Sequence, residues 1–137
     1  MSPEAVGVKG AINGALHTAG LKPSDISYVN AHGTGTENND YTEVHGMNQI
    51  FEVVPPYTST KSFTGHTLAA SGAIEAVYSL LSIRHQEIYP TLNWQTQMPE
   101  FNSKPQTEFV ASTKVNHVLS NSFGFGGNCS SLILSKV

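Results

Sequence analysis

The stretch VNAHGTGT, residues 29–36, constrains the fold of this chain more than any other. A run of β-forming residues at 26–30 leads into it and predicts a buried strand. His32 follows at the carboxyl end of that strand, and alternating glycine and threonine residues then form a loop. In α/β proteins, ligands bind at the carboxyl ends of strands. We therefore expect His32 to face a bound molecule.

The composition excludes several classes of function. The chain has 137 residues, enough for a single domain, which we place over residues 1–137. Apolar residues make up 39% and charged residues only 12%, which argues against disorder. The net charge of −3, with scattered basic residues, predicts no nucleic-acid partner. The chain has a single cysteine, which predicts a reduced, cytoplasmic setting. No apolar run approaches the roughly 20 residues of a membrane span, so no membrane span is predicted.

The first half of the chain predicts two helices on either side of the strand at 26–30. Residues 2–4 suit a helix start and Gly20 suits the end of that helix. The second helix is expected to begin at Asp40, which has capping-box spacing to Glu43. Its apolar face is formed by Val44, Met47, Ile50 and Phe51. A short strand is expected before Lys61.

The second half predicts one long helix and two closing strands. The helix, expected over residues 66–85, is nearly apolar all round and therefore predicts a central, buried element. One of its faces carries His66, Ala70, Ala73, Val77, Leu80 and Leu81. Residues 87–114 are predicted to run over the surface, with a short strand at 109–110. Strands are then expected at 118–123 and 130–134, which gives an α/β fold.

His32 allows two interpretations. A lone histidine after a strand is often a hydrogen-bonded structural residue. The adjoining Gly-Thr-Gly-Thr favours a ligand-binding role, because glycines open the backbone to a ligand and threonine hydroxyls can bind a polar, amide-bearing arm.

His66 and Lys61 form a second candidate group. We expect His66 at the start of the long helix, where the helix dipole disfavours a cation and Lys61 lowers the histidine pKa further. A neutral imidazole is a good hydrogen-bond donor to a developing oxyanion. The alternative role of His66 is a helix cap. Glu75, on the opposite side of the helix, requires a partner if it is buried. Lys61, a bound cation and solvent are the three alternatives.

The glycine-rich turn around Phe125 is the third candidate. An aromatic residue between glycines indicates a movable gate with exposed backbone N–H groups, and a plain hairpin turn is the alternative. A nucleophilic role for Cys129 is disfavoured, because a strand start does not lower a thiol pKa as a helix N-terminus does. We expect Cys129 to pack in the interior. The spacing of the six histidines predicts no zinc site.

Three stretches together resemble the β-ketoacyl synthases, the condensing enzymes of fatty acid and polyketide synthesis. They are VNAHGTGT (29–36), TKSFTGHTLAASGAIEA (60–76) and NSFGFGGN (121–128), in the order and separation typical of the family. The resemblance implies a thiolase-like α/β fold, of which the chain covers the C-terminal half. Helices would pack on a mixed sheet of the five-stranded type, with the first strand missing.

The resemblance also implies roles for the candidate residues. His32 and His66 match the two catalytic histidines, which donate hydrogen bonds to the thioester oxygen of a malonyl group as it loses CO₂. Lys61 matches a lysine that supports this site, and Glu75 matches the buried partner of that lysine.

The remaining implied roles concern the carrier arm and the gate. Thr34 and Thr36 match contacts to a phosphopantetheine arm. Phe125 matches a gating phenylalanine whose backbone N–H helps to form the acyl oxyanion hole. No cofactor of the chain's own is implied, since phosphopantetheine arrives on the acyl carrier protein. The implied partners are this carrier protein, the N-terminal ketosynthase half and a second copy in a homodimer. In some members a structural cation lies among Asn30, Glu75, Ser120 and Asn121.

The sequence departs from the family pattern in two ways. The family nucleophile is a cysteine on an Ala-Cys-Ser elbow in the N-terminal half, so we expect this chain alone not to condense substrates. Asn128 and Cys129 also stand where Thr-Asn is common. Two rival hypotheses remain. One is a non-catalytic partner subunit resembling a chain-length factor, which would not need His32, Lys61 and His66. The other is a thiolase that uses Cys129.

Overall fold

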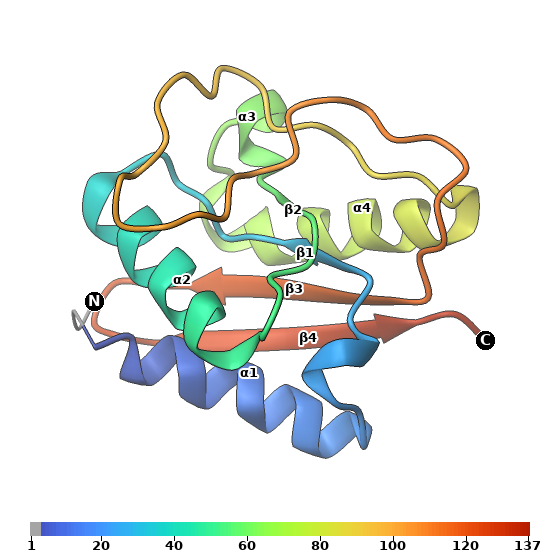
Figure 1. The fold of residues 1–137 in the computed structure, drawn as a ribbon, viewed down its shortest axis with the longest axis horizontal. Helices are drawn as coiled ribbons and strands as arrows, with labels where there is room; N and C mark the ends of the chain where they lie inside the picture. Colours follow the sequence, from blue (N-terminus) through green and yellow to red (C-terminus); the bar gives the residue numbers. More distant parts are fainter. Residues whose placement is uncertain (1–3) are drawn as a thin grey trace.

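The computed structural model describes residues 4–137 as an α/β fold (Figure 1). The helices are α1 (Val6–Ala19), α2 (Glu37–Ile50), α3 (Lys61–Thr64) and α4 (Ser71–His85). The strands are β1 (Tyr28–Asn30), β2 (Tyr57–Thr58), β3 (His117–Phe123) and β4 (Cys129–Ser135). Short 3₁₀ turns lie at Pro23–Asp25 and Leu68–Ala70. Within residues 4–137, no helix has the length and apolarity to span a bilayer.

The described strands form one mixed sheet in the order β2-β1-β3-β4. β1 runs parallel to both β2 and β3, and β4 pairs with β3 in the antiparallel direction. The mixed sheet predicted from the resemblance is confirmed. Because β1, β2 and β3 are parallel, their carboxyl ends meet at one edge of the sheet. His32, Lys61 and the glycine-rich turn at 124–128 directly follow these three ends.

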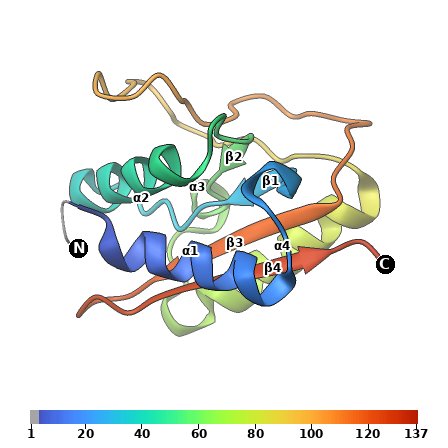
Figure 2. The same ribbon diagram turned by 60° about the horizontal axis from the view of Figure 1, so that its bottom comes forward.

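Helices cover both faces of the sheet (Figures 1 and 2). Successive residues of a strand point to opposite faces, and β3 shows this alternation. Leu119 packs into the larger apolar cluster, which α1 and α2 share through residues such as Ile12 and Met47. Val118 packs into a smaller cluster with Ile83 of α4. The site described below therefore lies at the edge of the sheet, between α2 on one face and α4 on the other.

The expected starts of the first two helices differ from the structure. α1 begins at Val6, and the predicted cap at Ser2 and Pro3 lies outside the described residues. The predicted end is confirmed, since Gly20 has a φ of 66° at the helix terminus. α2 begins at Glu37, so the start predicted at Asp40 is wrong. Asp40 lies inside the first turn, where its carboxylate accepts a hydrogen bond from the Gly35 N–H at 3.3 Å.

Helix α4 differs most from expectation. It begins at Ser71 rather than His66, after the 3₁₀ turn at Leu68–Ala70. The predicted central burial is wrong, because Val77 and Leu80 are 56% and 50% exposed. The side that faces the sheet is mainly polar and consists of Ser71, Glu75, Ser79, Ser82 and Ile83. Helical periodicity identified an apolar face, but it does not say which face packs on the sheet.

The remaining predictions agree with the structure, except for the short strand expected at 109–110, where only Val110 forms an isolated bridge. The closing strands are β3 and β4, and both are slightly longer than expected. The segment between α4 and β3 is irregular, apart from an isolated bridge between Ile88 and Val110. It runs along one side of the molecule (Figure 1). The strand before Lys61 is confirmed but contains only Tyr57 and Thr58.

Candidate active site

The loop after β1 depends on its glycines. Gly33 and Gly35 have φ angles of 41° and 75°, which residues with a Cβ rarely adopt. Gly33 is also in close contact with its neighbour, because an added Cβ would lie 2.5 Å from the Cβ of Ser59. The Ser59 hydroxyl donates to the Gly33 carbonyl at 2.7 Å. The sequence Gly-Thr-Gly-Thr thus allows the loop to turn against β2 and leaves His32 fixed beside the sheet.

His32 is buried and is held by Lys61. The Lys61 ammonium lies 3.2 Å from the His32 Nδ1 and donates to the His32 carbonyl at 2.6 Å. An ammonium group has no acceptor, so Nδ1 must accept this hydrogen bond. The ring proton therefore resides on Nε2, and His32 is a neutral imidazole with a donor N–H.

The surroundings of His32 keep it neutral. Burial, the Lys61 charge and His66 lower the His32 pKa from its ordinary value of 6.5 to about 4. The ring also makes an edge contact with Phe123 at a centroid distance of 5.6 Å. At neutral pH, His32 is therefore available as a hydrogen-bond donor and is a poor proton donor.

His66 acquires the same donor form in another way. Its Nδ1 accepts the backbone N–H of Leu68 at 3.1 Å, which leaves the ring proton on Nε2 in the neutral ring. Two expectations about His66 are corrected here. It lies five residues before the start of α4, so it is not at that helix N-terminus. Lys61 contacts the ring of His32 rather than that of His66.

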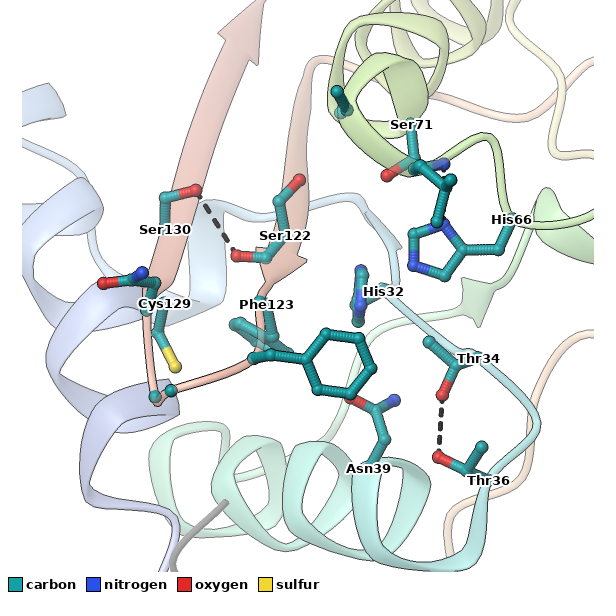
Figure 3. A pocket seen from close by; sticks show the side chains of 18 of the residues that line it. His32, Thr34, Thr36, Asn39, His66, Ser71, Ser122, Phe123, Cys129 and Ser130 are labelled. Atoms are coloured by element: carbon teal, nitrogen blue, oxygen red, sulfur yellow. Dashed lines mark hydrogen bonds between the residues drawn. The ribbon is translucent and has the colours of Figure 1, made fainter.

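The two imidazoles lie side by side. Their centroids are 5.4 Å apart with an interplanar angle of 84°. Both rings line a cavity of about 990 Å³ at the edge of the sheet. Figure 3 shows His66 on one side of His32 and the pair Thr34 and Thr36 on another. The two threonine hydroxyls are 2.9 Å apart and hydrogen-bonded, and Phe125 also lines the cavity with a fully exposed side chain.

Glu75 is buried and paired with Lys61. Its side chain is 2% exposed, so the solvent alternative is wrong. The Lys61 ammonium donates to the Glu75 carboxylate, which completes the three hydrogen bonds of that ammonium. Burial raises the pKa of Glu75, and the hydrogen bond and charge of Lys61 oppose this rise. The second Glu75 oxygen, Oε2, has no hydrogen-bond partner in the described residues.

Not all four residues considered for a cation have side chains available for one. The four are Asn30, Glu75, Ser120 and Asn121. Asn30 donates to the Glu75 carbonyl at 3.1 Å and pairs in register with Ser120. Its buried Oδ1, like the Glu75 Oε2, has no partner in residues 4–137, and two such oxygens suit a cation or a water. The Asn121 side chain instead contacts Glu43 and Ser131. No cluster of three or more His, Cys, Asp or Glu residues suited to a metal occurs in this part of the chain.

Cys129 lines the same cavity but is poorly suited to act as a nucleophile. Burial raises the pKa of its thiol, so little thiolate forms at neutral pH. It is half-buried against the larger apolar cluster, and a Cβ added at Gly7 would lie 2.9 Å from its sulfur. Packing is thus the role that its surroundings support.

Sequence reasoning missed Glu43 as a residue of the site. It is 1% exposed and accepts the backbone N–H groups of His32 and Gly33, both at 2.9 Å. We interpreted it as part of a helix cap. The available signal was its position four residues before Met47, which places a carboxylate on the apolar face of α2.

The chain is similar to known condensing enzymes. Residues 1–95 match the family "Beta-ketoacyl synthase, C-terminal domain". The 3-oxoacyl-[acyl-carrier-protein] synthase 2 of Staphylococcus aureus (strain COL) is 37% identical over 138 residues, which cover 98% of this chain and 33% of that protein. The chain therefore spans about a third of the length of this relative.

Solved ketosynthase structures share the fold, among them the following two. One is the ketosynthase ApeO in complex with its chain length factor ApeC from Xenorhabdus doucetiae, with a TM-score of 0.86 and 42% identity over 99% of this chain and 35% of that one. The other is AntDE:AntF, a type II acyl-carrier protein in complex with its ketosynthase, with a TM-score of 0.93 and 32% identity over 100% and 34%. The family match over residues 1–95, together with the thiolase-like ketosynthase fold, shows that this chain belongs to the β-ketoacyl synthases.

Proposed function

We propose that this chain supplies the two histidine donors of a β-ketoacyl-acyl carrier protein synthase. The observation that carries the proposal is that both Nδ1 atoms are occupied as acceptors, by Lys61 at His32 and by the Leu68 N–H at His66. Both rings are therefore neutral Nε2–H donors beside one cavity. Two such donors suit an oxygen on which negative charge develops.

The proposed reaction is a decarboxylative Claisen condensation of a malonyl thioester with an acyl thioester. His32 and His66 donate to the malonyl thioester oxygen. The bond to the carboxylate breaks, CO₂ leaves, and its electron pair forms an enolate that the two N–H groups stabilise. The enolate carbon attacks the acyl carbon, and the carbon–sulfur bond of the acyl thioester breaks. Its electron pair leaves with the sulfur as a thiolate, and a β-ketoacyl thioester results.

The acyl group is proposed to be held on a cysteine outside this chain, because Cys129 has a raised thiol pKa. Lys61 is proposed as a supporting residue that keeps His32 neutral, and Glu75 balances its charge in a buried setting. The phosphopantetheine arm is proposed to reach the histidines past Thr34 and Thr36, with Phe125 as the gate.

The proposed partners are an acyl carrier protein, the N-terminal ketosynthase half and a second copy in a homodimer. The description of AntDE:AntF as a carrier protein in complex with its ketosynthase supports the first. A structural cation is a further proposal. Asn30 and Glu75 would supply free oxygens beside Ser120, whereas the Asn121 side chain is engaged elsewhere.

The alternative is a non-catalytic subunit that resembles a chain length factor. The description of ApeO in complex with its chain length factor ApeC keeps this hypothesis open. The bonds that hold His32 and His66 as donors count against it, because a subunit without chemistry would not need to bury the Lys61 charge beside His32.

A chimera tests the proposal. This chain would replace the matching third of the Staphylococcus synthase, and release of labelled CO₂ from malonyl-acyl carrier protein would be measured together with condensation. We expect both activities, and their loss by at least about a hundredfold in His32→Gln and His66→Gln. The exposed His85→Gln is the matched control. A chimera that is folded but inactive would favour the non-catalytic alternative. The chain alone should not condense, and condensation by it that survives Cys129→Ala would contradict the incomplete-site hypothesis.

A further inference from the structure

Glu43 is a buried carboxylate that the proposed chemistry does not use. It comes from the second turn of α2 and points toward the edge of the sheet, where the loop after β1 begins. Its Oε1 accepts the His32 N–H at 2.9 Å and the Asn121 Nδ2–H at 3.0 Å. Its Oε2 accepts the Gly33 N–H at 2.9 Å. One side chain therefore contacts both the loop and strand β3.

The partners of Glu43 match an ionised carboxylate. All three of its hydrogen-bond partners in the described residues are N–H donors. A protonated carboxyl would need an acceptor for its own O–H, and none of these groups can supply one. Burial raises the pKa of Glu43, and the three donors oppose that rise.

Glu43 and Lys61 bind the two peptide groups on either side of the His32 Cα. Glu43 accepts the His32 N–H, whereas Lys61 donates to the His32 carbonyl. The backbone of His32 is thus fixed at both ends by buried charges of opposite sign. Lys61 additionally fixes the ring at Nδ1, so rotation of the loop would break several charge-assisted hydrogen bonds at once.

The connection extends from Glu43 to the hairpin of β3 and β4. The Asn121 amide donates to Glu43, and its Oδ1 accepts the Ser131 hydroxyl at 2.7 Å. Asn121 and Ser131 are register partners on the two strands that lead to the glycine-rich turn with Phe125. A chain of hydrogen bonds thus connects the His32 loop, through Glu43 of α2, to the hairpin.

We propose that Glu43 is an ionised positioning residue, which locks the His32 loop to the hairpin that carries Phe125. The proposal rests on the proposed function of His32 and Phe125. In that function, the imidazole faces the malonyl thioester oxygen and the Phe125 backbone N–H faces the acyl group that the enolate attacks, so the two donors must keep a fixed position relative to each other. The Glu43 Oε1 accepts hydrogen bonds from both the His32 N–H and the Asn121 amide. A shift of the hairpin would therefore move the loop as well.

The test uses amide resonances of the full 137-residue chain, with Glu43→Gln, Asn121→Leu and the control Met47→Ala. Met47 is fully buried four residues further along α2 and contacts the apolar cluster instead. In Glu43→Gln, one of the N–H groups faces an amide N–H, so we expect hydrogen exchange at His32 and Gly33 to accelerate about tenfold or more. Asn121→Leu should shift the His32 amide more than the Gly33 amide.

The control separates positioning from general destabilisation. Met47→Ala should leave the two amide resonances in place, although it lowers stability. Unchanged His32 and Gly33 amides in Glu43→Gln, or equal changes in Met47→Ala, would overturn the proposal. If Glu43→Gln does not fold, the native chain provides the test through the NMR resonance of the Glu43 carboxyl carbon. A resonance typical of a protonated carboxyl at pH 7 would also overturn the proposal. CO₂ release by the chimera fails or succeeds independently of these signals.

Discussion

Lys61 is bonded twice to His32, once at the ring Nδ1 and once at the backbone carbonyl. Its third hydrogen bond goes to Glu75. Lys61 is buried, since only 8% of the residue is exposed, and all three protons of its ammonium are used. Lys61 thus sets the tautomer of His32, its orientation and its neutral state together.

Lys61→Met tests this arrangement. The variant leaves the Glu75 carboxylate buried without its partner, which should cost about 3–5 kcal/mol of unfolding free energy. Lys61→Met with Glu75→Gln removes both charges, and we expect it to recover most of that loss. Urea unfolding at pH 7 measures both variants. A double variant as unstable as the single one would show that the ion pair is not the cause.

The neutral state of His32 predicts a pH dependence. With a pKa lowered to about 4, folded His32 stays unprotonated between pH 6.5 and 4, whereas the unfolded chain binds a proton there. The contribution of His32 to stability is therefore complete above pH 6.5, falls as the pH decreases toward 4, and is constant below that. The His32 ring resonances should titrate near 4, and the stability difference between the native chain and His32→Gln should narrow over the same window. A His32 midpoint near 6.5 would contradict the geometry.

The sequence predicted the elements of the site better than their connections. Three elements of the site were recognisable in the sequence, because each follows a strand or carries a dense local pattern. They are His32, Lys61 and the glycine-rich turn. The Lys61 contact was assigned to His66, since the two are five residues apart, while His32 is distant in sequence. Parallel pairing of β1 and β2 brings Lys61 to His32, and no local pattern encodes that pairing.

Helix α4 shows a second limit of sequence reasoning. Val77 and Leu80 are exposed, whereas its serines are buried on the side that faces the sheet. The Ser79 hydroxyl donates to the Glu75 carbonyl at 2.8 Å and is near the Asn30 amide. Glu43 was missed for a related reason, since its partners are backbone groups of a distant loop. Hydropathy ranks residues by transfer to an apolar phase and does not include such partners.

The reversed polarity of α4 predicts an unusual response to mutation. Val77→Lys should change the unfolding free energy by less than about 0.5 kcal/mol, because the side chain is more than half exposed. Ser79→Leu places a larger side chain in a fully buried position and removes a hydrogen bond, so we expect a loss of about 2 kcal/mol or more. Chemical denaturation of the two variants measures the difference. Greater damage from Val77→Lys would contradict the placement of the helix.

Two helical glycines make a matched pair for the packing of α1 against α2. A Cβ at Gly46 would lie 2.7 Å from Val8 and 3.3 Å from Ala5, so Gly46→Ala should separate the helices and destabilise the fold by about 1–3 kcal/mol. Gly10 lies in α1 with nothing within 4 Å, so Gly10→Ala should stabilise it by up to about 1 kcal/mol. Thermal unfolding should therefore shift in opposite directions. If the unfolding temperatures of Gly46→Ala and Gly10→Ala shifted by the same amount in the same direction, only helix propensity would be involved.

The loop after β1 offers the sharpest test of the site. Gly33 and Gly35 both have positive φ angles, so alanine strains the backbone by about 1 kcal/mol at either position. Only at Gly33 would the new Cβ also meet another group, Ser59, at 2.5 Å. Gly33→Ala should therefore be clearly less stable than Gly35→Ala and should displace the amide resonance of His32. Ser59→Gly, added to Gly33→Ala, removes the obstructing side chain and should restore the His32 resonance, although the backbone strain remains. Equal effects of the two single variants would mean that the contact between the loop and Ser59 does not position His32.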